Sequence, residues 1–160
     1  MNVPAMNLSV NGVTHEVRAP DNETLIDSLR DRLGLTGAKQ ACAMGNCGTC
    51  TVRLDGDTVY ACLVLTAECE TTEVTTIEGL ADGDRLDPVQ AAFVEADAFQ
   101  CGFCTPGQIM SVRALLDEIE CPTDADLIHG LAGNLCRCGA YDHILQAARL
   151  AAEHGRATDD

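Results

Sequence analysis

Three cysteines fall within nine residues near the middle of the first half of the chain, and their spacing is the strongest constraint on its fold. The stretch reads CAMGNCGTC, with the pattern C-x4-C-x2-C at Cys42, Cys47 and Cys50. A fourth cysteine, Cys62, follows after eleven intervening residues. Gly45 and Gly48 allow this short stretch to turn tightly and to point backbone N–H groups at the sulfur atoms. The stretch is therefore expected to be a loop that wraps a metal centre held by thiolates.

This spacing is typical of the four ligands of a plant-type [2Fe–2S] cluster, in which one loop holds three ligands and a distant cysteine completes the set. Zinc sites more often join two short pairs such as C-x2-C or H-x3-H, so zinc is the weaker interpretation. A disulfide set is the other alternative, and it needs an oxidising compartment. Residues 1–10 have neither the basic nor the apolar segment of a secretion signal. The chain is therefore predicted to be cytoplasmic, with its ten cysteines available to metal centres.

The composition restricts the partners more than the fold. Asp and Glu outnumber Lys and Arg by 25 to 10, which gives a formal net charge of −15. The phosphates of nucleic acid would be repelled by this charge, so no nucleic-acid partner is expected. No segment approaches the apolar length that spans a bilayer, so no membrane span is expected either. Aromatic residues are scarce, with no Trp, and the cores are expected to be small and aliphatic.

The first half of the chain reads as a mixed domain of strands and one helix. Asn11-Gly12 predicts a tight turn between strands at residues 7–10 and 14–18. Apolar residues at helical spacing from Leu25 to Leu33 predict a helix that Gly34 ends. Two further strands, at residues 50–54 and 58–62, are predicted to form a second hairpin, and residues 73–77 a last strand. This order of elements is that of the β-grasp architecture, in which plant-type ferredoxins are found.

The second half reads as helical after a connection at residues 79–88 that is rich in Gly, Asp and Pro. Helices are predicted at residues 88–96, from Pro106 to Ile119, from a capping segment at residues 122–126 to about His129, and at residues 141–153 with Gly155 as the stop. Four helices of this length predict a small bundle. The predicted architecture is α+β, with a plant-type ferredoxin domain at residues 1–80, a four-helix-bundle domain at residues 88–155 and a tail at residues 156–160.

The helical half contains a second set of four cysteines, spaced C-x2-C and, after 31 intervening residues, C-x-C. The set consists of Cys101, Cys104, Cys136 and Cys138. Each pair precedes a predicted helix, whose free N–H groups and partial positive charge suit an anionic thiolate centre. Spacing alone leaves a second [2Fe–2S] cluster and a four-cysteine zinc site both open. A thioredoxin-like redox pair at the C-x2-C motif lacks the βαβ context that it needs.

The two cysteine motifs, in this order and at this separation, resemble the small iron–sulfur subunit of the molybdenum hydroxylase family. That family includes xanthine dehydrogenases, aldehyde oxidoreductases, aerobic carbon monoxide dehydrogenases and bacterial dehydrogenases of N-heterocycles. The resemblance extends over nearly the whole chain, and its most specific piece is QCGFCTPG at residues 100–107. Further matching pieces lie at residues 33–37, 42–52, 76–80 and 134–138.

The resemblance implies two [2Fe–2S] clusters and a relay of electrons between partner subunits. The ligands of the cluster that faces a medium, FAD-binding subunit would be Cys42, Cys47, Cys50 and Cys62. The ligands of the cluster beside the molybdenum cofactor of a large subunit would be Cys101, Cys104, Cys136 and Cys138. Gln100 and Cys138 would contact the pterin of that cofactor. The implied function is electron transfer from molybdenum to FAD within an oxidoreductase heterotrimer, with no catalytic residue in this chain and no turnover by it alone.

Three positions depart from the family pattern. Ala41 precedes the first cysteine where the family usually has glycine, and a positive φ there would cost on the order of 1 kcal/mol. Ala43 follows that cysteine in place of a glycine or an acidic residue. Gly139-Ala140 follows the last cysteine where Thr-Gly is common. None of these changes removes a ligand, but they leave the cluster potentials and the substrate of the complex open.

Two of the ten cysteines belong to neither set. Cys69 and Cys121 lie outside both sets and are expected to be free or partly buried thiols.

A free-standing ferredoxin is the first alternative function, although such a carrier needs only the first domain. A zinc-stapled interaction module is the second, and it would be colourless whereas an iron–sulfur protein is red-brown.

Overall fold

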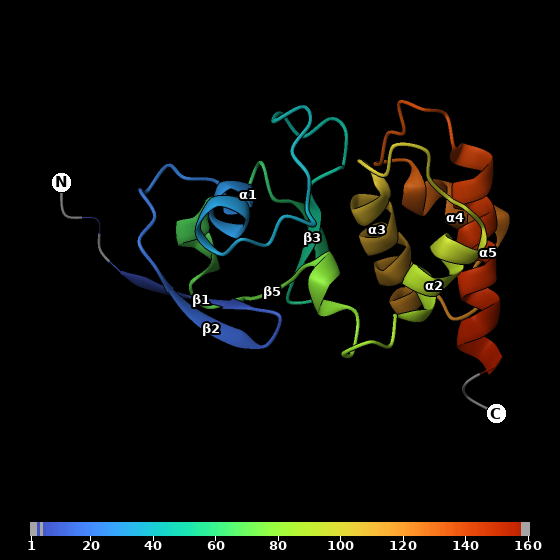
Figure 1. Ribbon diagram of the computed structural model, residues 1–160, viewed down its shortest axis with the longest axis horizontal. Coiled ribbons are helices and arrows are strands. Elements are labelled where there is room, and N and C mark those ends of the chain that lie inside the picture. The colour runs from blue at the N-terminus through green and yellow to red at the C-terminus, as the bar shows by residue number, and fades with distance from the viewer. Residues whose placement is uncertain (1–2, 4, 158–160) are drawn as a thin grey trace.

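The computed structural model describes residue 3 and residues 5–157 of the 160-residue chain. A sheet with one short helix forms the N-terminal half, and a group of longer helices forms the C-terminal half (Figure 1). This arrangement confirms the predicted α+β class, with a β-grasp half followed by a four-helix half. Within the described residues, no helix combines the length and the apolar character needed to cross a membrane.

A five-stranded sheet organises the N-terminal half. Its strands are β1 (Met6–Val10), β2 (Val13–Val17), β3 (Thr51–Leu54), β4 (Asp57–Tyr60) and β5 (Glu73–Thr75). Their order across the sheet is β2-β1-β5-β3-β4, with β1 parallel to β5 and every other pair antiparallel. The predicted turn between β1 and β2 is confirmed, because Asn11 and Gly12 have φ values of 53° and 75°. Both predicted hairpins therefore flank the central strand β5.

The end of β5 comes earlier than the sequence predicted. The strand stops at Thr75, because the N–H of Thr76 donates instead to Asn11 Oδ1 at 2.9 Å. Residues Ile77–Gly79 then form a 3₁₀ turn. Asn11, in the turn that joins β1 to β2, thus also ends β5. The alternation of side chains along β5 does not indicate this contact.

One helix packs its apolar side on the sheet. α1 (Leu25–Asp27) continues directly as a π-helical turn at Ser28–Arg32, in which the N–H of Leu33 donates to Ser28 O at 3.1 Å. Gly34, with a φ of 70°, ends the segment as predicted. The fully buried side chains of this aliphatic core include Leu8, Leu25, Ile26, Leu29, Val52 and Val74.

The C-terminal half contains four helices around a second core. They are α2 (Pro88–Glu95), α3 (Thr105–Glu118), α4 (Asp124–Leu131) and α5 (Tyr141–Ala157). The predicted cap of α4 is confirmed, since Thr123 Oγ1 accepts from Asp126 N at 3.3 Å and Asp126 Oδ2 accepts from Thr123 N at 2.8 Å. Core side chains include Phe93, Ile109, Val112, Leu127 and Ile144. α3 also packs against β3 and β4, so this helix joins the two halves (Figure 1).

The predicted end of the last helix is wrong. α5 passes through Gly155 and continues to Ala157, so residues 156–157 of the expected tail are helical. Residues 158–160 of that tail lie outside the described part of the chain. A single glycine costs a helix about 1 kcal/mol, which the preceding turns of a long helix can offset when no proline follows.

Candidate metal centres

The loop that follows α1 surrounds its first cysteine with backbone donors. The N–H of Asn46 donates to Cys42 Sγ at 3.4 Å. The N–H of Met44 is the main cause that lowers the pKa of Cys42 to about 6, and the Cys47 side chain and other N–H groups add to it. Such donors stabilise a thiolate, and they raise the reduction potential of a cluster that the thiolate binds.

Left-handed backbone angles turn this loop. Gly45 and Gly48 have φ values of 74° and 68°, as expected from their place between the cysteines. Ala43 is also left-handed, with a φ of 53°. Ala41 is not among the residues with positive φ, so the predicted strain at Ala41 is wrong. The strained residue comes after the first cysteine because the N–H groups that follow it must turn back towards its sulfur.

We expect Ala43→Gly to stabilise the protein by about 1 kcal/mol, because glycine adopts a positive φ without the Cβ clash that alanine has there. Ala41→Gly is the matched control, and it should instead lower the free energy of unfolding by about 0.5 kcal/mol through the added freedom of the unfolded chain. Urea unfolding of the cluster-loaded protein measures both. Equal effects of the two substitutions would contradict the assignment of backbone strain to Ala43 and not to Ala41.

The four thiols of the first set lie together in two pairs. The Cys47 side chain affects the pKa of Cys42, and the Cys62 side chain affects the pKa of Cys50, so each thiol has a close neighbour in the set. Cys50 and Cys62 form the inner pair, at 2% and 6% exposed, and burial raises the pKa of Cys50 to about 12. A [2Fe–2S] cluster takes two protein ligands at each of its two irons. Two pairs of thiols are the arrangement that such a cluster requires.

The second set repeats this arrangement. Cys101 lies beside Cys138, whose side chain affects the pKa of Cys101, and both residues are exposed. Cys104 lies beside Cys136, which is buried. Burial raises the pKa of the Cys104 thiol to about 11. Each set therefore has a more buried inner pair and a more accessible outer pair.

The starts of two helices supply the donors expected at the second set. α3 begins directly after Cys104, and α5 begins at Tyr141. The N–H of Ala140 donates to Cys136 Sγ at 3.4 Å. Burial opposes ionisation of Cys136, but the N–H of Ala140 and neighbouring donors outweigh it and lower the pKa of this thiol. An anionic centre at this place is therefore stabilised by the backbone.

The state of the thiols excludes one of the interpretations that the sequence left open. A structural zinc site brings four ligands to a single ion. All ten cysteines are free, which excludes a disulfide set. Neighbouring pairs of thiols are compatible with the two irons of a [2Fe–2S] cluster.

The two cysteine sets border a common cavity although one lies in each half of the chain. This cavity has a volume of about 320 Å³ and is lined by Cys47 from the first set and by Cys101, Cys104 and Cys136 from the second. The N–H of Leu135, the residue before Cys136, donates to Cys47 O at 2.9 Å. Both cysteine-bearing loops lie at the upper edge of the molecule in Figure 1. The junction of the two halves is thus also the meeting point of the two sets.

Gln100 lies beside the second cysteine set, whereas Cys69 and Cys121 lie apart from both sets. Gln100 is exposed, next to the outer cysteine Cys101. Cys69 is fully buried and donates its thiol to Leu65 O at 3.6 Å, whereas Cys121 is exposed. Neither Cys69 nor Cys121 joins a set, in agreement with the expectation that both are free thiols.

Three residues at the junction were missed by sequence reasoning. Thr49 Oγ1 lies 3.3 Å from Cys47 Sγ. The buried Gln108 follows Cys104 by one helical turn, and its amide opposes the effect of burial on the pKa of that thiol. Asn134 is buried between the two halves. The four-residue spacing of Gln108 from a cysteine at a helix start could have identified it, because residues i and i+4 share a helix face.

Both halves of the chain match known family models. Residues 8–84 match the 2Fe-2S iron-sulfur cluster binding domain, and residues 76–149 match the [2Fe-2S] binding domain. These matches agree with one cysteine set in each half.

Similar proteins cover the chain over nearly its full length. It is 41% identical to the nicotinate dehydrogenase small FeS subunit of Eubacterium barkeri, over 96% of this chain and 98% of that protein. The crystal structure of quinoline 2-oxidoreductase from Pseudomonas putida 86 superimposes with a TM-score of 0.92 and 34% identity over 98% of both chains. The aldehyde oxidoreductase from Desulfovibrio desulfuricans gives a TM-score of 0.91 and 41% identity, but the match spans 17% of that longer chain. The chain therefore belongs to the small iron–sulfur subunits of the molybdenum hydroxylase family, electron-transfer subunits with two [2Fe–2S]-binding domains.

Proposed function

We propose that this chain relays electrons from the molybdenum cofactor of a large subunit to the FAD of a medium subunit. The observation that carries the proposal is that Cys47 of the first set and three cysteines of the second set line one cavity between the two halves. The proposed cluster ligands are Cys42, Cys47, Cys50 and Cys62 in the first set and Cys101, Cys104, Cys136 and Cys138 in the second. The bound clusters supply one-electron transfer. The chain sets their separation, their burial and the hydrogen bonds to their sulfur atoms.

The exposure of its outer pair supports the proposal that the second cysteine set faces the large subunit. Cys101 and Cys138 are both exposed, and the exposed Gln100 stands directly before Cys101. The amide of Gln100 offers two N–H donors and one acceptor, which suit the edge of a pterin. We assign Gln100 and Cys138 as the residues that contact the pterin cofactor held by that subunit.

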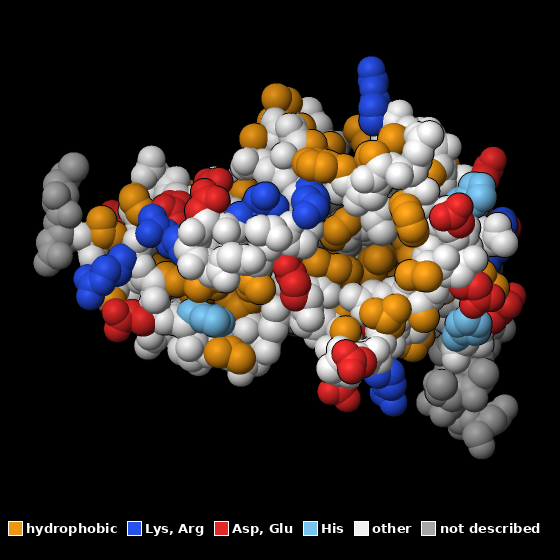
Figure 2. All heavy atoms as spheres, viewed as in Figure 1, with side chains coloured by type: hydrophobic (Ala, Val, Ile, Leu, Met, Phe, Trp, Pro, Cys, Tyr) orange, Lys and Arg blue, Asp and Glu red, His pale blue; other side chains and the backbone are white. Residues whose placement is uncertain are grey.

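Apolar surface beside each cysteine set supports two partner subunits. Met44 and Leu63, near the first set, are 64% and 62% exposed. Phe99, two residues before the C-x2-C motif of the second set, and Phe103, within that motif, are also exposed. Figure 2 shows apolar side chains gathered over the helical half and the junction on one face of the molecule. Clustered apolar surface of this kind marks protein–protein contact, so we place one partner at each set.

We further propose a domain division at residues 1–80 and 88–155 and a cytoplasmic location. The division is supported by two separate apolar cores, one formed by residues 8–74 and the other by residues 89–151. The location is supported by ten cysteines of which none is in a disulfide, as expected in a reducing compartment.

Purification of the tagged chain from its native host tests the relay against a free-standing ferredoxin. The relay predicts that a large and a medium subunit copurify, with molybdenum, FAD and about four irons for each copy of this chain. A free-standing carrier would purify as a cluster-loaded monomer without molybdenum or FAD, and that result would overturn the proposal.

The substitution Gln100→Ala tests the orientation of the second set. We expect both clusters to load normally while the activity of the assembled complex falls by about 10-fold, because a polar contact to the cofactor is lost. Gln146→Ala, at an exposed glutamine of α5, is the matched control and should change neither property. Unchanged activity of the Gln100→Ala complex would remove Gln100 from the cofactor contact.

A further inference from the structure

One buried side chain fastens the two halves of the molecule together. Asn134 is 3% exposed, and its Nδ2 donates to Gly48 O at 2.9 Å and to Thr51 Oγ1 at 3.3 Å. Its Oδ1 accepts from Ser111 Oγ of α3 at 2.7 Å. Because a carbonyl oxygen only accepts, the bond to Gly48 O requires the NH₂ group on that side. The amide therefore bridges the first cysteine loop and α3 with all of its hydrogen-bonding groups in use.

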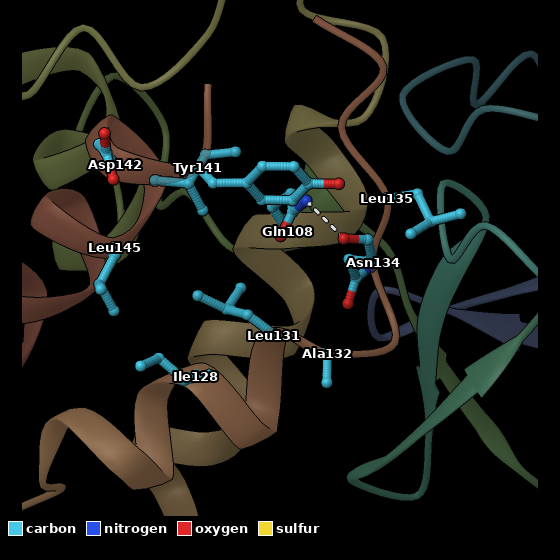
Figure 3. Close-up of a pocket in the computed structure, with 10 residues that line it drawn as sticks. Gln108, Ile128, Leu131, Ala132, Asn134, Leu135, Tyr141, Asp142 and Leu145 are labelled. Carbon is cyan, nitrogen blue, oxygen red and sulfur yellow. Dashed lines mark hydrogen bonds between the residues drawn. The ribbon is translucent and has the colours of Figure 1, made fainter. Parts of the chain in front are cut away.

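The backbone of the same segment is held equally firmly. Asn134 O accepts from Gln108 Nε2 at 3.2 Å, and the N–H of Asn134 donates to Leu131 O at 3.0 Å. Figure 3 shows the Gln108 amide directed at this carbonyl from α3. The next residue, Leu135, donates its N–H to Cys47 O at 2.9 Å. Two consecutive carbonyls of the first cysteine loop are thus bonded to two consecutive residues of the segment that leads into Cys136.

Glycines bring the backbones close enough for these bonds to form. A Cβ on Gly48 would lie 2.3 Å from Gly133 O, and a Cβ on Gly107 would lie 2.3 Å from Gly48 O. Tyr60 Oη of β4 adds a hydrogen bond to Gly133 O at 2.9 Å. The contact is therefore backbone against backbone, with few flexible side chains that could absorb a shift.

We propose that Asn134 is a positioning residue that fixes the separation and orientation of the two [2Fe–2S] clusters, and so sets the rate of electron transfer between them. The proposal rests on the proposed function, because it needs both cysteine sets to hold clusters. The hydrogen bond to Gly48 O is the decisive contact, since it acts on the loop between two ligands of the first set. Electron transfer weakens steeply with distance, so a small displacement at this contact has a large effect on the rate.

The substitution Asn134→Asp tests this role with little change in shape. The carboxylate retains an acceptor for Ser111 but replaces the donor to Gly48 O with an oxygen that repels it. Asn134→Leu is a second variant that removes the donor without adding a buried charge. Ser111→Ala is the matched control, because it removes a partner of Asn134 on the α3 side and leaves the bonds to Gly48 and Thr51 in place.

The measurement uses the full chain, reconstituted with iron and sulfide and fully reduced. At low temperature, two nearby reduced clusters split each other's EPR signals, and this splitting falls with distance. We expect both Asn134 variants to retain both clusters with their individual g-values and to lose the splitting, while Ser111→Ala retains it. In the assembled complex, reduction of the first-set cluster during a single turnover should slow at least about 10-fold.

The outcomes distinguish a failure of the proposed function from a failure of the positioning role of Asn134. If the wild-type chain holds only one cluster, the proposed function itself fails. If the wild-type chain holds two clusters and both Asn134 variants retain the wild-type splitting, the positioning role fails while the relay stands. Loss of iron from the second set in both variants would also overturn the positioning role, because Asn134 would then only support the site that holds the metal.

Discussion

The substitution Cys138→Ser should eliminate the normal signal of the second-set cluster and leave the first-set cluster intact. Cys138 is an exposed outer thiol beside Cys101. A serine hydroxyl is a much poorer iron ligand than a thiolate, so we expect iron to fall from about four to about two per chain. Low-temperature EPR and an iron assay measure this change. The assembled complex should lose its activity, because the outer ligand lies on the side assigned to the large subunit.

The control for this experiment is Cys121→Ser. Cys121 is also exposed, but it lies outside both sets. Its substitution should change neither the iron content nor either EPR signal. If Cys138→Ser instead abolishes the first-set signal, the division of the cysteines into two sets is wrong.

The substitution Gly107→Ala should have the largest effect on stability. The new Cβ would lie 2.3 Å from Gly48 O and 3.2 Å from Thr49 Cα, both of which are backbone atoms held by hydrogen bonds. Neither atom can move without displacing the first cysteine loop. We expect the free energy of unfolding to fall by about 3 kcal/mol, at the upper end of the range for overpacking. Urea unfolding of the loaded protein measures the loss.

Gly130→Ala provides the matched control for Gly107→Ala. Both glycines lie in helices with ordinary φ, but a Cβ on Gly130 would meet only the flexible end of the Leu115 side chain, at 2.9 Å. That side chain can rotate away, and alanine favours a helix over glycine by about 1 kcal/mol. The Gly130 variant should therefore be as stable as the wild type or more so. Similar losses in both variants would contradict the close backbone contact at the junction.

Local features of the sequence predicted much of the fold. Asn11-Gly12 specified the first hairpin because both residues adopt positive φ, and Thr123 with Asp126 specified the start of α4 because their side chains cap each other. The eight cysteines of the two sets were singled out because few other proteins require thiols at these spacings. In each case a short segment carries the information by itself.

Features that depend on the approach of distant segments were not predicted. Asn134 begins the matching piece at residues 134–138, but no local feature indicates its contacts, because its partners Gly48 and Thr51 lie more than eighty residues earlier in the chain. The need for glycine at position 107 comes from the backbone of the opposite half rather than from its own helix. The strain at Ala43, and not at Ala41, depends on how the loop folds around Cys42. Tertiary contacts decide such positions, and a single sequence does not display them.

The most direct test of the two-cluster relay is low-temperature EPR of the dithionite-reduced chain, with iron, sulfide and zinc assayed on the same sample. The relay predicts two distinct S = 1/2 signals, about four irons and about four sulfides per chain, and no zinc. One signal with about two irons and about one zinc per chain would contradict it. In that case only the first set would hold a cluster, and the protein would be a ferredoxin with a zinc-bound helical domain.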